Sequence, residues 1–155
     1  MKIPLIFILH DIRSMNNVGS LFRTADALGL EKIYLCGITG RPPHREIQKT
    51  ALGATETVAW EWKPGISEVI EQLRKKNYTI LALEQTPDAQ ALQNYKVKGP
   101  LALVLGNEIE GVPNEITSVC DQTLVIEQFG EKKSMNVAVA SGIAAWWLSQ
   151  QFREF

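Results

Sequence analysis

The sequence predicts an α/β fold with a mostly parallel sheet and helices on both faces of the sheet. Short segments such as residues 5–9 and 101–105 are continuously apolar, which is typical of strands buried on both sides. Segments with the apolar spacing of helices alternate with these strands along the chain. The chain has 155 residues, of which 45% are hydrophobic and 21% charged, so it is long enough for one globular domain with a core of its own.

The N-terminal part of the chain begins with a strand over residues 5–9, and a polar loop follows it. A helix is predicted over residues 17–28, with Asn17 as its N-cap and Gly29 directly after its C-terminal end. The apolar residues of this helix fall on one face, at Val18, Leu21, Phe22, Ala25 and Leu28. Arg23 lies about 140° around the helix from Val18, so we expect its side chain to point away from the core.

The middle of the chain continues the alternation of strands and helices. Three strands are predicted, over residues 33–36, 58–62 and 79–83. Two helices lie between them and each begins at a proline, over residues 43–49 and 64–76. Residues 84–99 are expected to form a loop with one helical turn. Beyond the strand at residues 101–105, a short helix and a last strand are predicted over residues 113–119 and 123–126.

The C-terminal helix is predicted to begin at Ser134, whose hydroxyl can cap the first turn. Small and apolar residues follow on nearly all sides, which indicates a helix buried on most of its faces. A polar loop runs directly into this helix start. The free N–H groups and the positive dipole end of a buried helix start suit a polar ligand. The alternative is a packing helix with an ordinary cap.

The candidate site follows from the sheet, because ligands of such sheets bind at the carboxyl ends of the strands. The relevant loops therefore follow Leu9, Leu83, Leu105 and Ile126. Unusual polar content is found in three segments, residues 10–19, 106–111 and 130–136. The chain has no glycine-rich phosphate signature, no cluster of His and Cys at metal-binding spacing and no nucleophile elbow. We therefore expect no metal.

Charge and cysteine content give further bounds. The net charge is −1, but residues 1–50 hold seven Lys or Arg against four Asp or Glu. This basic excess could face phosphates and includes Arg13, Arg41, Arg45 and Lys49. Cys36 and Cys120 are far apart and are expected to be buried and reduced, which favours a cytoplasmic protein. No apolar run reaches the roughly 18 residues that a membrane span requires, so no membrane partner is expected.

Three segments resemble the sequence motifs of a known enzyme family. Residues 17–29 read NVGSLFRTADALG, residues 103–112 read LVLGNEIEGV, and residues 126–140 contain SMNVAVA. In this order and spacing they resemble the three motifs of the SpoU (TrmH-type) RNA 2′-O-ribose methyltransferases of the SPOUT superfamily. Residues 49–54, KTALGA, also resemble a segment common in that family. The resemblance covers nearly the whole chain.

The resemblance implies an α/β trefoil-knot fold, with the C-terminal segment threaded through a loop. It implies that S-adenosyl-L-methionine binds within the knot, largely through backbone groups. The corresponding positions here are Leu83, Glu84, Leu105, Gly106, Ile126, Ser134 and Met135. It also implies a homodimer with the C-terminal helix and the first-motif helix at the interface, so that one subunit's arginine could serve the other's cofactor.

The resemblance gives Arg23 the central place in removing the proton from the ribose 2′-hydroxyl. Arginine is a poor general base, because its pKa exceeds 12, but it can grip a phosphate and stabilise a developing alkoxide. Asn17 and Glu108 would order the first-motif loop, while Ser134 and Asn136 would orient Arg23 or the ribose. From the residues alone, Arg23 could be a solvated helix arginine, Asn17 only a cap and Glu108 a solvated loop acid.

Two departures from the family pattern stand out. The third motif begins Ile126-Glu127-Gln128, where the family usually has Ile-Pro-Met, so the rigidity of a proline is lost. The length also leaves no room for a separate RNA-binding domain, so RNA would be gripped by Arg13, Arg41, Arg45 and Lys49 or by a partner. Trp146 and Trp147 are expected in the core or the dimer interface rather than as base-stacking platforms.

The function that we predict is S-adenosylmethionine-dependent methylation of a ribose 2′-hydroxyl of RNA, with tRNA as the first candidate substrate and rRNA as the second. An alternative of another class is an RNA-binding or assembly factor that kept this scaffold and lost methyl transfer. The altered third motif keeps that alternative open. A nucleotide-binding regulatory domain is disfavoured, because the chain lacks a phosphate-binding loop.

Overall fold

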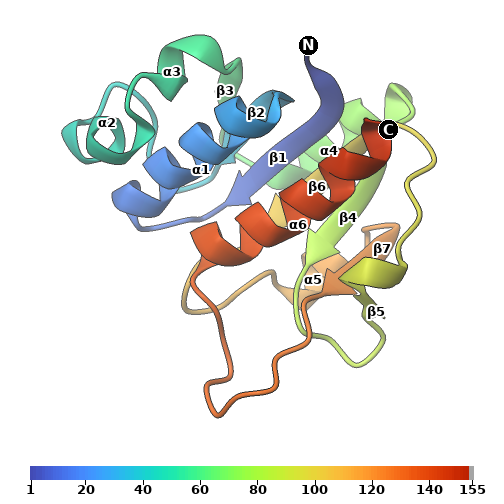
Figure 1. Cartoon of the computed structure of the whole chain (residues 1–155). Coiled ribbons are helices and arrows are strands. Elements are labelled where there is room, and N and C mark those ends of the chain that lie inside the picture. Colours follow the sequence, from blue (N-terminus) through green and yellow to red (C-terminus); the bar gives the residue numbers. More distant parts are fainter. Residues whose placement is uncertain (154–155) are drawn as a thin grey trace.

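Seven strands form one sheet, in the order β3-β2-β1-β6-β4-β7-β5 (Figure 1). The computed structural model describes residues 1–153, and within them every paired strand is parallel to its neighbour. The strands are β1 (Ile3–His10), β2 (Leu30–Cys36), β3 (Trp60–Lys63), β4 (Thr79–Leu83), β5 (Gln90–Ala91), β6 (Leu101–Leu105) and β7 (Gln122–Val125). The predicted parallel sheet is confirmed, and β5 is an addition to it.

Helices cover both faces of the sheet, as predicted. They are α1 (Met15–Leu28), α2 (Arg45–Ala51), α3 (Ala54–Thr57), α4 (Ile66–Lys75), α5 (Asn114–Thr117) and α6 (Val137–Phe152), with a 3₁₀ turn, η1 (Leu92–Asn94). In Figure 1, α1 and α6 lie side by side over one face, and they are in contact. Residues of α4 and α5 pack into a second core on the other face.

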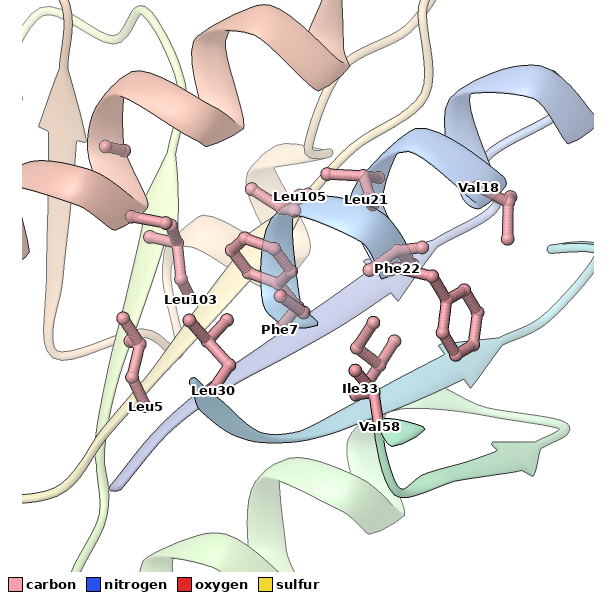
Figure 2. Close-up of a cluster of buried hydrophobic side chains, with 14 of the residues drawn as sticks. Leu5, Phe7, Val18, Leu21, Phe22, Leu30, Ile33, Val58, Leu103 and Leu105 are labelled. Atoms are coloured by element: carbon pink, nitrogen blue, oxygen red, sulfur yellow. The ribbon is translucent and has the colours of Figure 1, made fainter. Parts of the chain in front are cut away.

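The strands divide their side chains between these two cores, because successive side chains of a strand point to opposite faces. Leu5, Phe7 and Leu9 of β1 belong to the core under α1 and α6, whereas Ile6 and Ile8 belong to the other core. Figure 2 shows the first core, with Leu21 and Phe22 of α1 directed at side chains of the strands. The buried apolar runs in the sequence thus reflect strands covered on both sides.

The start of α1 differs from the prediction. Helix α1 begins at Met15, and its N-cap is Ser14, whose hydroxyl accepts a hydrogen bond from the backbone N–H of Asn17 at 3.1 Å. Asn17 is therefore inside the first turn and its side chain is free for another role. The predicted end is confirmed, since Gly29 has the left-handed φ of 69° that favours glycine at this position.

The start of the C-terminal helix was also predicted wrongly. Asn136, not Ser134, is the N-cap of α6, and its Oδ1 accepts hydrogen bonds from the backbone N–H groups of Ala138 and Val139 at 2.8 and 3.3 Å. The expected burial on most faces is confirmed, since all residues of α6 but three are buried or half-buried, but one face is exposed. Val139, Ile143 and Trp146 are 54%, 43% and 53% exposed, and their spacing places them on one face of α6.

Other boundaries shifted by a few residues, and one helix was missed. Val58 was predicted to begin a strand, but it ends the short helix α3, and β3 begins only at Trp60. Helix α2 begins at Arg45 rather than Pro43, because His44 Nδ1 accepts a hydrogen bond from the Glu46 N–H and caps the helix. None of the helices in residues 1–153 is long and apolar enough to cross a membrane.

A close approach between α1 and α2 explains the glycine of the first motif. A Cβ atom at Gly19 would lie 2.0 Å from Thr50 Oγ1 and 2.3 Å from the Ile47 carbonyl oxygen. Only glycine lets the two helices come this close. The contact is extended by the Thr50 hydroxyl, which donates to the Asn16 carbonyl at 2.9 Å. Helix α2 is thereby held beside the first turn of α1.

Candidate active site

A cavity of about 220 Å³ lies at the carboxyl ends of β4, β6 and β7. Its wall combines the ends of these strands with the loop after β6 and the segment that leads into α6. All seven positions predicted to hold the cofactor line it, namely Leu83, Glu84, Leu105, Gly106, Ile126, Ser134 and Met135. The rule that ligands bind at strand ends therefore located this cavity correctly.

The loop after β6 is a tight turn built on Asn107. Asn107 Oδ1 accepts hydrogen bonds from the backbone N–H groups of Ile109 and Glu110, at 2.9 and 2.7 Å, and its carbonyl accepts from Gly111 N–H at 3.0 Å. A Cβ atom at Gly106 would lie 2.2 Å from the Gly111 carbonyl carbon, so the base of the turn is closed by two glycines. The turn gives the cavity a wall of fixed shape.

A chain of three side chains connects the three motifs at this end of the sheet. Asn17 Nδ2 donates to Glu108 Oε2 at 3.1 Å, and Asn136 Nδ2 donates to Asn17 Oδ1 at 3.4 Å. The backbone N–H of Ser14 donates to the same Glu108 oxygen at 3.3 Å. The structure thus brings together three of the five residues predicted to be catalytic.

The environment of Glu108 favours its ionised form. Partial burial of the carboxylate raises the pKa, but hydrogen bonds from its own backbone, from Asn17 and from the backbone of Ser14 and Arg13 outweigh burial. The pKa of Glu108 consequently lies below its ordinary value. Glu108 is thus an acceptor that organises the start of α1, because a proton donor would need a raised pKa.

The remaining two predicted catalytic residues do not join this chain. Ser134 is exposed and lines the cavity. Arg23 is exposed on α1 and is not among the residues that line the cavity, and within residues 1–153 no hydrogen bond or ion pair involves its side chain. Within this chain, Arg23 is therefore not part of the cavity wall.

Of the predicted RNA-binding residues, Arg13 and Arg41 lie in loops after β1 and β2, whereas Arg45 begins α2 and Lys49 lies in its last turn. Arg13, Arg41, Arg45 and Lys49 are all exposed. Lys49 forms an ion pair with Glu46 at 3.3 Å, whereas the Arg41 guanidinium stacks over the Trp62 ring at 4.3 Å from its centre. The stack fixes a planar cation at the carboxyl end of the sheet.

Hydrogen bonds from Thr39 and Trp62 hold the loop that carries Arg41. The buried Thr39 hydroxyl donates to the carbonyls of Leu9 and Cys36, and it accepts from the Ile12 N–H at 3.0 Å. Trp62 Nε1 donates to the Gly37 carbonyl at 3.1 Å. These bonds hold the loop after β2 against the loop after β1.

Several residues of the site were missed in the sequence. Cavity-lining residues outside the prediction include Gln85, Gln128, Val137 and Ala140, whereas Asn107 and Ile109 were predicted only as part of the polar segment 106–111. Asn107 could have been found, because asparagine after a strand commonly builds such a turn. Trp62 carries no signal for its contact with Arg41. Among residues 1–153, no group of three or more His, Cys, Asp and Glu side chains is placed to hold a metal ion.

The sequence is similar to those of proteins named as rRNA methyltransferases. The chain is 31% identical over 149 residues to the 23S rRNA (guanosine-2'-O-)-methyltransferase RlmB of Haemophilus influenzae, which covers 96% of this chain and 60% of that protein. It is 29% identical to RlmB of Pectobacterium atrosepticum, over 92% of this chain and 58% of the relative. The chain therefore spans about three fifths of the length of these curated relatives.

Solved structures confirm the predicted fold class. The A. aeolicus TrmH/SpoU tRNA modifying enzyme superposes with a TM-score of 0.88 at 25% identity, over 97% of this chain and 76% of that chain. The SpoU methyltransferase AviRb from Streptomyces viridochromogenes, solved with AdoMet, gives a TM-score of 0.87 at 20% identity, over 97% and 59%. The AviRb match shows the fold alone.

The family model for the SpoU rRNA Methylase family matches residues 4–146, which is nearly the whole chain. It covers all the residues that form the cavity and the Asn17–Glu108–Asn136 chain. This protein belongs to the SpoU rRNA methylase family.

Proposed function

We propose that this protein is an S-adenosylmethionine-dependent RNA methyltransferase that acts on a ribose 2′-hydroxyl. The observation that carries the proposal is the link between the three motifs. Asn17, Glu108 and Asn136 form one hydrogen-bonded chain beside a cavity lined by every residue expected to hold the cofactor. Packing alone requires no such polar chain between two helix starts and a loop.

The cavity fits the proposed cofactor in its chemistry. Leu83, Leu105 and Ile126 supply apolar wall for a planar base, while Ser134 and the backbone of the strand ends offer polar groups. When bound, S-adenosylmethionine supplies an electrophilic methyl group on a sulfonium. The residues of the chain would hold the ribose hydroxyl in line with that methyl group and exclude water.

The proton of the ribose hydroxyl must leave or be polarised during transfer. We assign Arg23 to binding the adjacent phosphate and stabilising the developing alkoxide. Asn17 and Glu108 would position the start of α1, and Ser134 and Asn136 would orient the ribose or the arginine. Because Arg23 stands apart from the cavity of its own protomer, we propose that the partner subunit's Arg23 completes the site.

The proposal therefore includes a homodimer built on α6 and α1. Val139, Ile143 and Trp146 form an exposed apolar face on α6, directly beside α1. An apolar face of this kind on a helix suits a second copy of the same surface related by a twofold axis. Half-buried Trp147 packs against the core instead.

The proposed substrate is a tRNA or an rRNA. A relative at 31% identity is named for 23S rRNA and a structural match at 25% identity for tRNA, and these names support both classes equally. We propose that residues 1–155 act as one methyltransferase domain in the cytoplasm. RNA would lie over Arg13, Arg41, Arg45 and Lys49, next to the first turn of α1.

Calorimetric titration with S-adenosylmethionine and with S-adenosylhomocysteine is the first test. Saturable micromolar binding is expected, followed by transfer of labelled methyl groups to tRNA or rRNA and by 2′-O-methyl mapping of the product. The assembly-factor alternative rests on Glu127 and Gln128. Glu127 is exposed, and its Oε1 accepts a hydrogen bond from Gln93 Nε2 at 3.3 Å. Gln128 lines the cavity. RNA binding without any binding of either ligand would favour that alternative.

A further inference from the structure

The side chain of Glu84 connects the ends of neighbouring strands at the cavity. Its backbone N–H donates to the Leu124 carbonyl of β7 at 3.0 Å. Its Oε1 accepts a hydrogen bond from the Val112 N–H at 2.8 Å, across the sheet at the end of the loop after β6. Its Oε2 accepts from the Gln85 N–H at 3.0 Å. One carboxylate therefore ties β4 to the loop of the second motif.

The loop is shaped to receive this carboxylate. A Cβ atom at Gly111 would lie 2.3 Å from Glu84 Oε1, and Gly111 has a left-handed φ of 68°. Glycine at 111 thus serves two needs, the turn and the close approach of Glu84. At the other end of the loop, a Cβ atom at Gly106 would lie 2.4 Å from the Val112 N–H nitrogen that Glu84 binds.

A carboxylate suits this position better than an amide. Both partners, the Val112 and Gln85 N–H groups, are donors, and an ionised carboxylate offers two acceptor oxygens and no donor. A glutamine would turn its NH₂ toward one of the two N–H groups. Hydrogen bonds to a charged acceptor are also stronger than those between neutral groups.

We propose that Glu84 is a positioning residue, whose carboxylate holds residues 106–112 in the conformation that accepts the cofactor. The family resemblance assigns this position only a backbone contact. The proposal rests on the proposed function for the identity of the ligand, S-adenosylmethionine. The part of the proposal that concerns the loop does not depend on the ligand. It is supported by the hydrogen bonds that Glu84 accepts from Val112 and Gln85 and by its close contact with Gly111.

The test compares Glu84→Ala and Glu84→Gln with Glu71→Ala, which removes an exposed carboxylate from α4, away from the cavity. Hydrogen exchange of the Val112 amide reports on the loop, and calorimetry with S-adenosylmethionine and S-adenosylhomocysteine reports on the cavity. Glu84→Ala is expected to weaken binding of both ligands at least tenfold and to speed Val112 exchange. Glu84→Gln should lie between it and the wild type, and Glu71→Ala should match the wild type.

RNA affinity separates positioning from general damage to the fold. It should stay within about twofold of the wild type in both Glu84 variants, because the basic segment is anchored independently through Thr39. Ligand binding and Val112 exchange that are unchanged in Glu84→Ala would overturn the proposal. A wild-type protein that binds neither ligand would overturn the proposed function, and amide exchange alone would then decide whether Glu84 fixes the loop.

Discussion

Asn17 Nδ2 donates a hydrogen bond to Glu108 Oε2 at 3.1 Å, and this bond connects residues 91 positions apart in the chain. The first turn of α1 contains no acidic residue of its own. Glu108 supplies the negative charge that a helix N-terminus favours, and it also accepts from the Ser14 N–H. The second motif thus stabilises the start of the helix that carries the first motif.

Glu108→Gln should lower the free energy of unfolding at pH 7 by about 1 kcal/mol, since it weakens hydrogen bonds to a charged acceptor. The folded pKa of Glu108 lies below the ordinary 4.5, so its contribution is present above pH 4.5 and is lost as pH falls through the folded value. Urea unfolding from pH 7 to pH 3 checks both points. A difference between wild type and variant that persists unchanged at pH 3 would contradict this assignment, and Glu131→Gln is the control.

Arg23→Ala should abolish methyl transfer and leave the fold and the affinity for S-adenosylmethionine intact. Arg23 is exposed, and its replacement should change the free energy of unfolding by less than about 0.5 kcal/mol. Arg23→Lys should also remain strongly impaired, because lysine cannot grip a phosphate bidentately. Single-turnover transfer rates with saturating cofactor provide the measurement. Activity retained in Arg23→Ala would remove Arg23 from the mechanism.

Mixing two inactive variants tests whether Arg23 acts across subunits. Gly106→Ala should distort the cavity wall and prevent cofactor binding, because its Cβ would lie 2.2 Å from the Gly111 carbonyl carbon in the turn. A mixed dimer with Arg23→Ala combines one intact cavity with one intact arginine from the other subunit. An equal mixture should recover about a quarter of wild-type activity if assembly is random in a twofold dimer. Recovery that stays at zero after verified subunit exchange would place Arg23 in its own subunit's site.

Ile143→Asp should convert the proposed dimer to a monomer, because it places a charge in the apolar face of α6. Val119→Asp is the matched control, since Val119 is 48% exposed and Ile143 43%, but Val119 lies outside α6. Light scattering after gel filtration gives the mass directly. If Ile143→Asp and Val119→Asp both remain dimeric, this face is not the interface. If both become monomeric, the introduced charge acts nonspecifically.

The sheet and the cavity could be predicted because their signals are local. Continuous apolar runs such as Leu101–Leu105 report burial on both faces, and the alternation with helices reports parallel strands. Strand ends then located the cavity without knowledge of any distance. The motif resemblance added functional roles that no pattern assigns, such as those of Asn17 and Asn136.

The helix starts were predicted less well, because neighbouring polar residues compete to cap them. Ser14 and Asn17 can each cap α1. Ser14 is the cap, because the Asn17 side chain donates to Glu108 instead. Ser134 and Asn136 compete in the same way for α6. The exposed face of α6 could not be predicted from its residue types, since small apolar residues are equally common in a core and in a subunit interface.

Arg41→Ala should weaken RNA binding and reduce the slope of log affinity against log salt by about 1, if Arg41 contacts one phosphate. Trp62→Leu should have part of the same effect, because it removes the ring that holds the guanidinium 4.3 Å from its centre. Trp62→Phe preserves a ring and should bind nearly as well as the wild type. Lys75→Ala, on the opposite face of the sheet, is the control. An unchanged salt slope in Arg41→Ala would mean that RNA contacts Arg13, Arg45 and Lys49 without Arg41, and the stack on Trp62 would then serve only to hold the loop.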